Sequence, residues 1–172
     1  MAVPAPTPGN LAQKLAGQPI PRVHLGQYVD GHLIARPATE FLGRGRAFLA
    51  GAPGAFTPIC SQKHIPNLVQ NADTMRAAGI DALYCVVTSD PFSVAAWARV
   101  VDPQGKIRFL SDGNLQFARS LGLTSREDSL FMGERSMRYA LSVRDGVIQS
   151  GNVERSVLDF SCTSAEHILE LD

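Results

Sequence analysis

The residues best suited to chemistry lie in one short stretch, residues 53–61, with the sequence PGAFTPICS. Cys60 follows a turn rich in Gly and Pro, and this turn follows a short apolar segment at 46–51. Thr57 and Pro58 both favour the start of a helix, so Cys60 is expected in the first turn of that helix. Unpaired N–H groups and the positive end of the helix dipole favour the thiolate there, and the thiolate is the reactive form of cysteine.

Two further cysteines lie elsewhere in the chain. Cys85 lies within the continuously apolar run ALYCVV, which is typical of a central strand, where a cysteine behaves as a small hydrophobe. Cys162 directly precedes the helix-start pattern of Thr163 and Glu166, and we expect it in an accessible loop where the helix N-terminus favours its thiolate. Residue types alone leave open whether Cys60 is reactive or a packed cysteine beneath a turn.

The composition limits the function classes. The chain has 172 residues, 45% of them hydrophobic, with 16 Lys+Arg against 16 Asp+Glu. This is the make-up of one compact domain, and the neutral balance argues against a nucleic-acid or membrane-surface binder. No apolar run approaches the roughly 20 residues of a membrane helix. Three cysteines, an odd number, predict a reducing compartment, so we expect the protein in the cytoplasm.

Metal and cofactor motifs are absent from the sequence. Cys60 and His64 could lie on one helix face, but two ligands without a second pair make a poor zinc site. The chain has no phosphate-binding glycine loop, no HExxH motif and no paired CxxC motif. We therefore expect neither a metal nor a cofactor.

The elements that must position Cys60 follow from the apolar pattern. Residues 1–17, with prolines clustered at the start, predict a flexible N-terminal tail, and residues 18–172 predict one domain. Strands expected near 46–51, 82–87, 107–110 and 137–143 alternate with helices, which predicts an α/β three-layer sandwich. A helix is expected over 58–78, kinked where Pro66 removes a donor.

The segment GAPGAFTPICSQKHIP at 51–66 resembles the active-site segment of the peroxiredoxins, specifically the type II or peroxiredoxin-5 subfamily of redoxin domains. The family spaces a Pro, a Thr and the peroxidatic Cys as Pro53, Thr57 and Cys60 are spaced here. Blocks at 89–99, 109–114 and 137–148 resemble later family segments in the same order. The resemblance runs from about residue 18 to the C-terminus and implies a thioredoxin-like fold with a mixed central sheet.

This resemblance implies a thiol-dependent peroxidase that reduces hydrogen peroxide and organic hydroperoxides in antioxidant defence and redox homeostasis. The Cys60 thiolate would attack the peroxide and become a sulfenic acid. Thr57 would contact both the thiolate and the peroxide, and Pro53 would shield the thiolate from water. Arg138 matches the arginine that the family carries on a later strand, where it would stabilise the thiolate and hold the peroxide.

The resemblance also implies how Cys60 is restored. Cys162 is expected to resolve the sulfenic acid through an intramolecular disulfide, the atypical two-cysteine arrangement, with direct resolution by glutathione or glutaredoxin next and Cys85 last. Thioredoxin or glutaredoxin/glutathione would be the reductant, and a homodimer is expected. His64 and Trp97 match family positions too: His64 would face the pocket mouth, or lie on the surface or pack as an ordinary helix residue, and Trp97 would pack near the active site.

Two other readings remain open from the sequence. A peroxiredoxin-fold protein could serve as a redox sensor or thiol relay with little turnover. A cysteine hydrolase could use Cys60 with a histidine, although His64 has no evident carboxylate to orient it.

Overall fold

A mixed sheet of seven strands runs through the centre of the computed structural model, which describes residues 8–171, and the side chains of 12–169. Its strand order is β2-β1-β5-β4-β3-β8-β9, with β3, β4 and β5 parallel and the other neighbours antiparallel. The strands are β1 (His24–Val29), β2 (His32–Pro37), β3 (Arg46–Ala52), β4 (Ala82–Val87), β5 (Arg108–Ser111), β8 (Tyr139–Arg144) and β9 (Val147–Val153).

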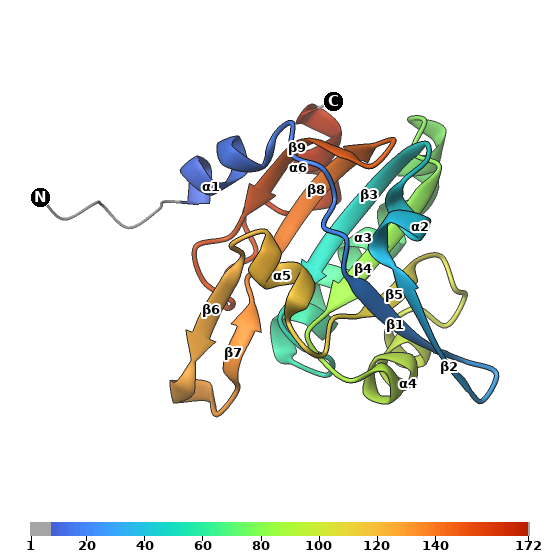
Figure 1. Cartoon of the computed structure of the whole chain (residues 1–172), viewed down its shortest axis with the longest axis vertical. Coiled ribbons are helices and arrows are strands. Elements are labelled where there is room, and N and C mark those ends of the chain that lie inside the picture. The colour runs from blue at the N-terminus through green and yellow to red at the C-terminus, as the bar shows by residue number, and fades with distance from the viewer. Residues whose placement is uncertain (1–7, 172) are drawn as a thin grey trace, which may run out of the picture.

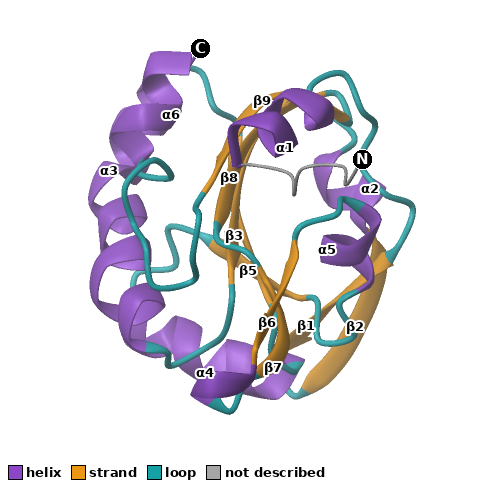
Figure 2. Cartoon of the chain, turned by 90° about the vertical axis from the view of Figure 1, so that its left-hand side faces the viewer, coloured by secondary structure: helices purple, strands orange, loops and turns teal. Residues whose placement is uncertain are grey.

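Helices cover both faces of this sheet, which confirms the predicted three-layer α/β sandwich (Figure 2). One face carries α3 (Ile65–Ala77), α4 (Pro91–Val101) and α6 (Ala165–Leu171). The other carries α1 (Pro8–Leu15), α2 (Ala38–Leu42) and α5 (Gln116–Ser120). A separate hairpin of β6 (Thr124–Glu127) and β7 (Gly133–Ser136), joined through the 3-10 turn η2 (Asp128–Leu130), projects from the body (Figure 1).

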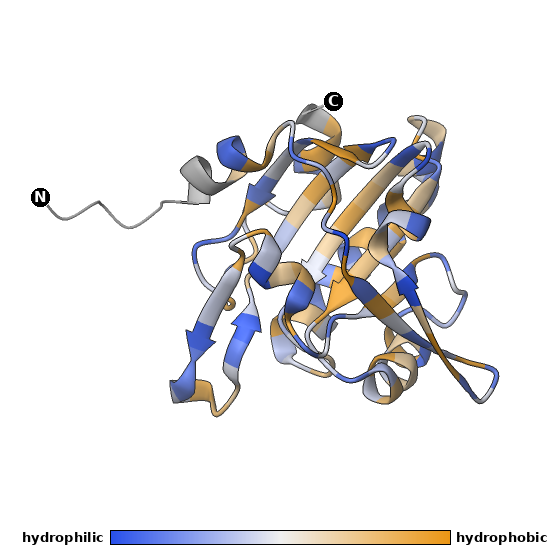
Figure 3. Ribbon diagram, in the orientation of Figure 1, coloured by the Kyte–Doolittle hydropathy of each residue, from blue (hydrophilic) through white to orange (hydrophobic). Residues whose placement is uncertain are grey.

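Alternation along β3 divides the core between the two faces of the sheet. Phe48 and Ala50 belong to the apolar cluster beneath α3 and α4, whereas Ala47 and Leu49 belong to the cluster on the opposite face. The central strands are accordingly coloured as hydrophobic along most of their length (Figure 3). Cys60 belongs to the cluster beneath α3 and α4, so packing in the core positions the thiol.

The N-terminal segment departs from the prediction. Residues 8–15 form α1, which packs beside β9, and Leu15 and Ile20 are buried in the core. Backbone N–H groups of Gly17 and Ile20 donate to the carbonyls of Ile148 and Gly146. The predicted flexible tail is therefore wrong for residues 8–17, because apolar side chains there bury against an edge strand. Residues 1–7 lie outside the described part of the chain.

The helix that carries Cys60 also differs from its prediction. It begins at Pro58, but residues Cys60–His64 form a π-helical turn, η1, before α3. The Ile65 N–H donates to the Cys60 carbonyl, one residue beyond the α-helical pattern. This extra residue accommodates Pro66 in the first turn of α3, where its missing N–H is tolerated. A π turn therefore lies directly before the proline at which the kink is predicted.

Within residues 8–171, no helix has both the length and the apolar character that a membrane span requires. The same part of the chain contains no group of three or more His, Cys, Asp or Glu residues arranged to hold a metal ion.

Candidate active site

The turn between β3 and the following helix sets the position of Cys60. Phe56 adopts a left-handed backbone conformation with φ of 60°, an uncommon state for a bulky residue. The Thr57 hydroxyl donates to the Gly54 carbonyl at 2.8 Å, and the Ala55 N–H donates to Ser89 Oγ at 3.0 Å. These bonds hold the turn so that the next residues enter the helix and bury Cys60 completely.

Arg138 reaches Cys60 from the residue just before β8. It immediately precedes β8, whose register pairs Tyr139 with Gly51 and so places Arg138 beside the end of β3. The ring of Tyr139 occupies the space that a side chain at Gly51 would need, so only glycine fits there. The guanidinium is buried, and Nη1 donates to Cys60 Sγ at 3.2 Å. The structure thus brings together Cys60 and the arginine that the resemblance indicated.

The remaining donors of Arg138 hold the C-terminal loop. Nη2 donates to the Val157 carbonyl at 2.8 Å, and Nε donates to the Asp159 carbonyl at 3.1 Å. Bonds on all three nitrogens fix the plane of the guanidinium, which makes it a preorganised donor rather than a mobile surface charge.

His64 lies fully buried beside the same guanidinium and not at a pocket mouth, so of the two expectations the packing one is correct. Because arginine only donates, His64 Nδ1 accepts from Arg138 Nη1 at 2.8 Å and the proton of the neutral ring resides on Nε2. Burial, and then the charge of Arg138, hold the pKa of His64 well below its usual value. With Nδ1 occupied, His64 is no oriented base, which removes the basis for the hydrolase reading.

A cavity of about 230 Å³ is lined by Arg138, which donates to the Cys60 thiol, and by the residues just before Cys60, although Cys60 itself does not line it. Its polar contributions come from Thr57 and the guanidinium of Arg138, and Pro53 lies on its wall. Most of its remaining lining is apolar: Pro58, Ile59, Leu130, Met132, Val157 and Leu158. The three residues that the family motif placed around Cys60 therefore share one cavity.

Trp97 packs against the active-site helix, as predicted. It is fully buried, and its indole Nε1 donates to the hydroxyl of Ser61 at 3.0 Å. Its ring meets Phe109 edge to face, with centroids 5.7 Å apart. Trp97 thereby connects α4 to the residue that follows Cys60.

Cys162 lies half-buried in the loop before α6, and its environment differs from the prediction. Burial, and then the adjacent carboxylate of Glu154, raise the pKa of Cys162 to about 11. The expected gain in thiolate character is therefore wrong. Glu154 accepts the N–H groups of Ser161, Cys162 and Thr163, so a negative charge occupies the position where the helix N-terminus was to favour the thiolate.

The predicted pairing of Thr163 with Glu166 at this helix start is also wrong. The Thr163 hydroxyl donates to Glu154 at 3.0 Å, whereas Ser164 Oγ accepts from the His167 N–H at 3.4 Å. Glu166 instead accepts from Asn67.

Cys85 lies in β4 among apolar side chains and is fully buried. Burial, with a contribution from nearby Cys60, raises the pKa of Cys85 well above its usual value. All three cysteines are free thiols.

Sequence reasoning missed Glu154 and Arg135. Arg135 donates to the Met132 carbonyl at 2.8 Å and also to the Thr88 carbonyl, and so joins β7 to the loop after β4. Neither residue lies in a recognisable motif. Their partners are distant in sequence or depend on loop conformation, so spacing carried no signal for them.

A buried cysteine, held by an arginine that lines an apolar cavity on this α/β sandwich, defines a thioredoxin-like protein of thiol redox chemistry. The Redoxin family model matches residues 15–168. The chain is 36% identical over 141 residues to mitochondrial peroxiredoxin-2F of Arabidopsis thaliana, covering 82% of this chain and 70% of that relative. It is 30% identical over 161 residues to peroxiredoxin-2B of the same plant, covering 93% and 99%.

Solved structures agree with these relatives. Reduced Prx3 from Vibrio vulnificus, in complex with hydrogen peroxide, superposes with a TM-score of 0.84 at 33% identity, covering 91% of this chain and 97% of that one. The chain belongs to the redoxin family and is a peroxiredoxin, a thiol-dependent peroxidase.

Proposed function

We propose that Cys60 is the peroxidatic nucleophile and that Thr57, Arg138 and Pro53 form its catalytic environment. The observation that carries this proposal is the 3.2 Å bond from Nη1 of Arg138, which also lines the cavity, to Cys60 Sγ. A buried cation that donates to sulfur stabilises the negative charge of a thiolate. Cys85 and Cys162 have no such donor among the described contacts.

The reaction transfers one oxygen atom to sulfur. The Cys60 thiolate attacks one peroxide oxygen, the O–O bond breaks, and the leaving oxygen takes a proton to depart as water or an alcohol. Four of the five N–H donors of Arg138 have partners among the described residues, which leaves one for the peroxide as charge moves onto the leaving oxygen. The Thr57 hydroxyl donates to Gly54, so its lone pairs can accept the peroxide O–H.

The substrate class includes organic hydroperoxides as well as hydrogen peroxide. Apolar side chains such as Ile59, Met132 and Leu158 form most of the cavity wall and can bury an alkyl group. Comparing kcat/KM for hydrogen peroxide and for cumene hydroperoxide tests this assignment, and a strong preference for hydrogen peroxide would contradict it.

Cys162 is the proposed resolving cysteine. Both thiols are free and belong to different surroundings, so a disulfide requires movement of one or both segments. The helix after Cys60 has a weak point, because in the i→i+5 pattern the partner of the Ser61 carbonyl would be Pro66, which has no N–H. Amide exchange at 58–65 is therefore expected to be faster than in β4.

Replacing the thiol tests its role. Cys162→Ser is expected to lose the peroxide-induced Cys60–Cys162 bridge in peptide mass mapping and to accumulate sulfenic acid or mixed disulfides. Cys85→Ser serves as the matched control and should retain the bridge. Normal turnover of Cys162→Ser with a thioredoxin system would assign resolution to an external thiol. The same assay run with glutaredoxin and glutathione identifies the reductant.

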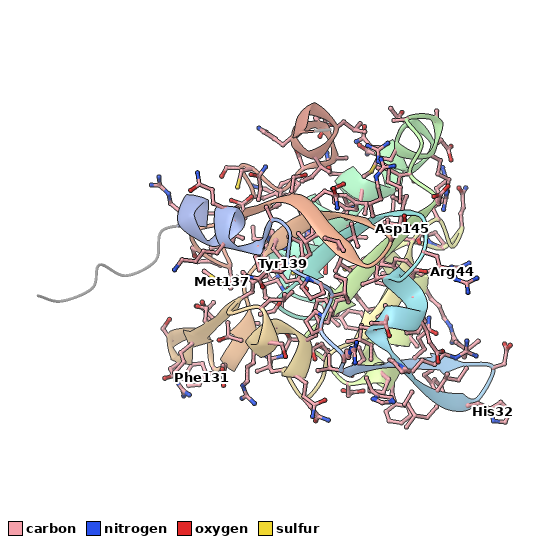
Figure 4. All side chains as sticks on the ribbon, turned by 45° about the horizontal axis from the view of Figure 1, so that its top comes forward. His32, Arg44, Phe131, Met137, Tyr139 and Asp145 are labelled. Carbon is pink, nitrogen blue, oxygen red and sulfur yellow. The ribbon has the colours of Figure 1, made fainter. Side chains whose placement is uncertain are left out.

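A homodimer through the edge of the active-site face completes the proposal. Apolar side chains surround this edge, with Phe131 98% and Leu158 60% exposed. Phe131 projects from the outside of the molecule, whereas Tyr139 points into its interior (Figure 4). Phe131→Ser is expected to shift the light-scattering mass of the reduced protein from dimer to monomer. The control Val100→Ser, on α4, should not, and a monomeric wild type would contradict the proposal.

We place the protein in the cytoplasm, on the basis of its three free cysteines. Relatives carry the names of mitochondrial and chloroplastic forms, so cell fractionation decides between these compartments.

The second candidate function is a redox sensor with little turnover. The observation that favours it is the raised pKa of Cys162, about 11, which slows resolution. Stoichiometric oxidation by peroxide without steady-state turnover would select the sensor.

A further inference from the structure

The loop that carries Cys162 is tied to the active-site arginine at its beginning. The backbone N–H of Glu154 donates to the Arg138 carbonyl at 2.9 Å. Further along the loop, the guanidinium of Arg138 bonds to the carbonyls of Val157 and Asp159. These three hydrogen bonds therefore attach the first half of the loop, residues 154–159, to Arg138.

The second half of the loop is held by the Glu154 side chain. Its carboxylate accepts the N–H groups of Ser161 at 2.7 Å, Cys162 at 2.8 Å and Thr163 at 3.0 Å. It also accepts the hydroxyls of Ser161 at 2.9 Å and Thr163 at 3.0 Å. Glu154 is only 1% exposed, and a buried carboxylate is stable only when its oxygens are satisfied in this way.

The charge state of Glu154 follows from these contacts. Burial alone would raise the pKa of Glu154, but the hydrogen bonds from Cys162, Ser161 and Thr163 outweigh it and hold the pKa below its usual value. The carboxylate is therefore ionised at neutral pH, directly beside the Cys162 thiol.

The Cys162 thiol does not line the peroxide cavity. Cys162 Sγ donates to the Val153 carbonyl at 3.6 Å, and Asn152 donates to the Cys162 carbonyl at 2.9 Å. Cys162 lines a separate cavity of about 750 Å³. Leu158, in the same loop as Cys162, borders both the cavity lined by Arg138 and the cavity lined by Cys162.

We propose that Glu154 is a positioning residue for the resolving step, a latch that keeps Cys162 withdrawn and so limits the rate at which the Cys60–Cys162 disulfide forms. The inference rests on the proposed resolving role of Cys162. In this step the Cys162 sulfur attacks the sulfur of Cys60 sulfenic acid. An S–S bond forms, the S–O bond breaks, and hydroxide leaves with the thiol proton as water. Cys162 enters at the thiol level and Cys60 at the sulfenic level, and the disulfide shares this oxidation between the two sulfurs, so no other oxidant is needed.

Glu154 acts on this step in two ways. Its bonds to the three N–H groups must break before Cys162 can reach Cys60. Its charge also opposes loss of the thiol proton. Lowering a thiol pKa by one unit raises the thiolate fraction about tenfold but lowers intrinsic nucleophilicity about threefold, a net gain of about threefold at neutral pH.

The variant Glu154→Gln keeps the shape and one acceptor oxygen but removes the charge. After one equivalent of peroxide, acid quenching at timed intervals and mass spectrometry measure sulfenic acid and disulfide separately. Disulfide formation is expected to be at least about threefold faster than in the wild type, with no change in the rate of Cys60 oxidation. The pH profile of Cys162 alkylation should shift to lower pH, a change that a merely structural role would not produce.

Glu166→Gln is the matched control, because it removes a carboxylate from the start of α6 that contacts Asn67 and Asn71 rather than Cys162. It should leave both measurements unchanged. Glu154→Asp keeps the charge but shortens the reach, so it should accelerate disulfide formation with a smaller shift in alkylation. It also provides a second variant should Glu154→Gln fold poorly.

The outcomes separate this proposal from the resolving role of Cys162. A bridge that forms in the wild type, and at the same rate in both Glu154 variants, overturns the latch and leaves Cys162 as resolving cysteine. Slower formation in both variants also overturns it, because Glu154 would then assist the step. Absence of the bridge in the wild type overturns the resolving role, and the latch with it.

Discussion

Cys60 and Cys162 lie in contrasting environments within one chain. Cys60 is fully buried, and its sulfur accepts a hydrogen bond from a cation. Cys162 is half-buried in a loop, and its sulfur donates to a carbonyl beside a carboxylate. The two thiols therefore differ in the charge beside them: Cys60 accepts a hydrogen bond from a buried cation, whereas burial and then the carboxylate of Glu154 keep the Cys162 thiol protonated.

The largest effect is expected from removing the Cys60 thiol. Cys60→Ser should abolish peroxide reduction, because a serine hydroxyl supplies no comparable nucleophile near neutral pH. The peroxide-consumption assay should fall to background while circular dichroism remains native. Residual turnover above a few per cent would move the chemistry to another cysteine.

Removing the cation is the next largest change. Arg138→Ala should slow the oxidation of Cys60 by about 10²–10³-fold, the usual loss for a preorganised transition-state donor. It should also lower the melting temperature, because the carbonyls of Val157 and Asp159 lose their donors. Arg144→Ala, at the exposed end of β8, removes the same charge as a control and should change neither rate nor stability appreciably.

The pH dependence of the resolving step sharpens the contrast. Since the pKa of Cys162 is raised to about 11, its thiolate fraction grows with pH throughout the neutral range. Disulfide formation should therefore accelerate by about tenfold per pH unit between pH 7 and 9. Quenched-flow mass spectrometry across this range measures it. A rate that levels off below pH 9 would show that proton loss from Cys162 is not the controlling event.

The smallest expected effect concerns His64. Its pKa is lowered in the folded protein, so the unfolded chain binds the proton more tightly and stability falls as pH drops below about 6.5. The slope of this contribution approaches about 1.4 kcal/mol per pH unit for one proton until the pKa of the folded state is reached. Urea unfolding at pH 5 and pH 7 should show a weaker dependence in His64→Gln. Equal dependence in both proteins would refute this assignment.

The central strands could be predicted from the sequence because each is marked by its own local pattern of apolar residues. The run ALYCVV became β4, and the alternating segment near 137–143 became β8. The family motif also located Pro53, Thr57 and Cys60 in the turn after β3 and the start of the following helix. Arg138 needed the resemblance, because a charged residue at the start of a strand looks the same whether it faces solvent or a buried thiol.

The features that escaped prediction depend on partners distant in sequence. The α1 helix is stabilised by burial of Leu15 and Ile20 against β9, which the short N-terminal sequence does not reveal. The β6–β7 hairpin lacks a strong apolar alternation. Glu154 looks like an ordinary residue at the end of a strand. Only because residues 161–163 fold back over it does its carboxylate accept their three N–H groups.

The bond between Trp97 and Ser61 has an optical consequence. Trp97 is the one tryptophan in the chain, and its indole N–H donates to the hydroxyl of the residue that follows Cys60. Indole emission responds to hydrogen bonding and to water, so any movement of the active-site helix changes the fluorescence of a single, unambiguous emitter. The protein therefore carries its own label, and its redox cycle can be followed in real time without dye or mutation.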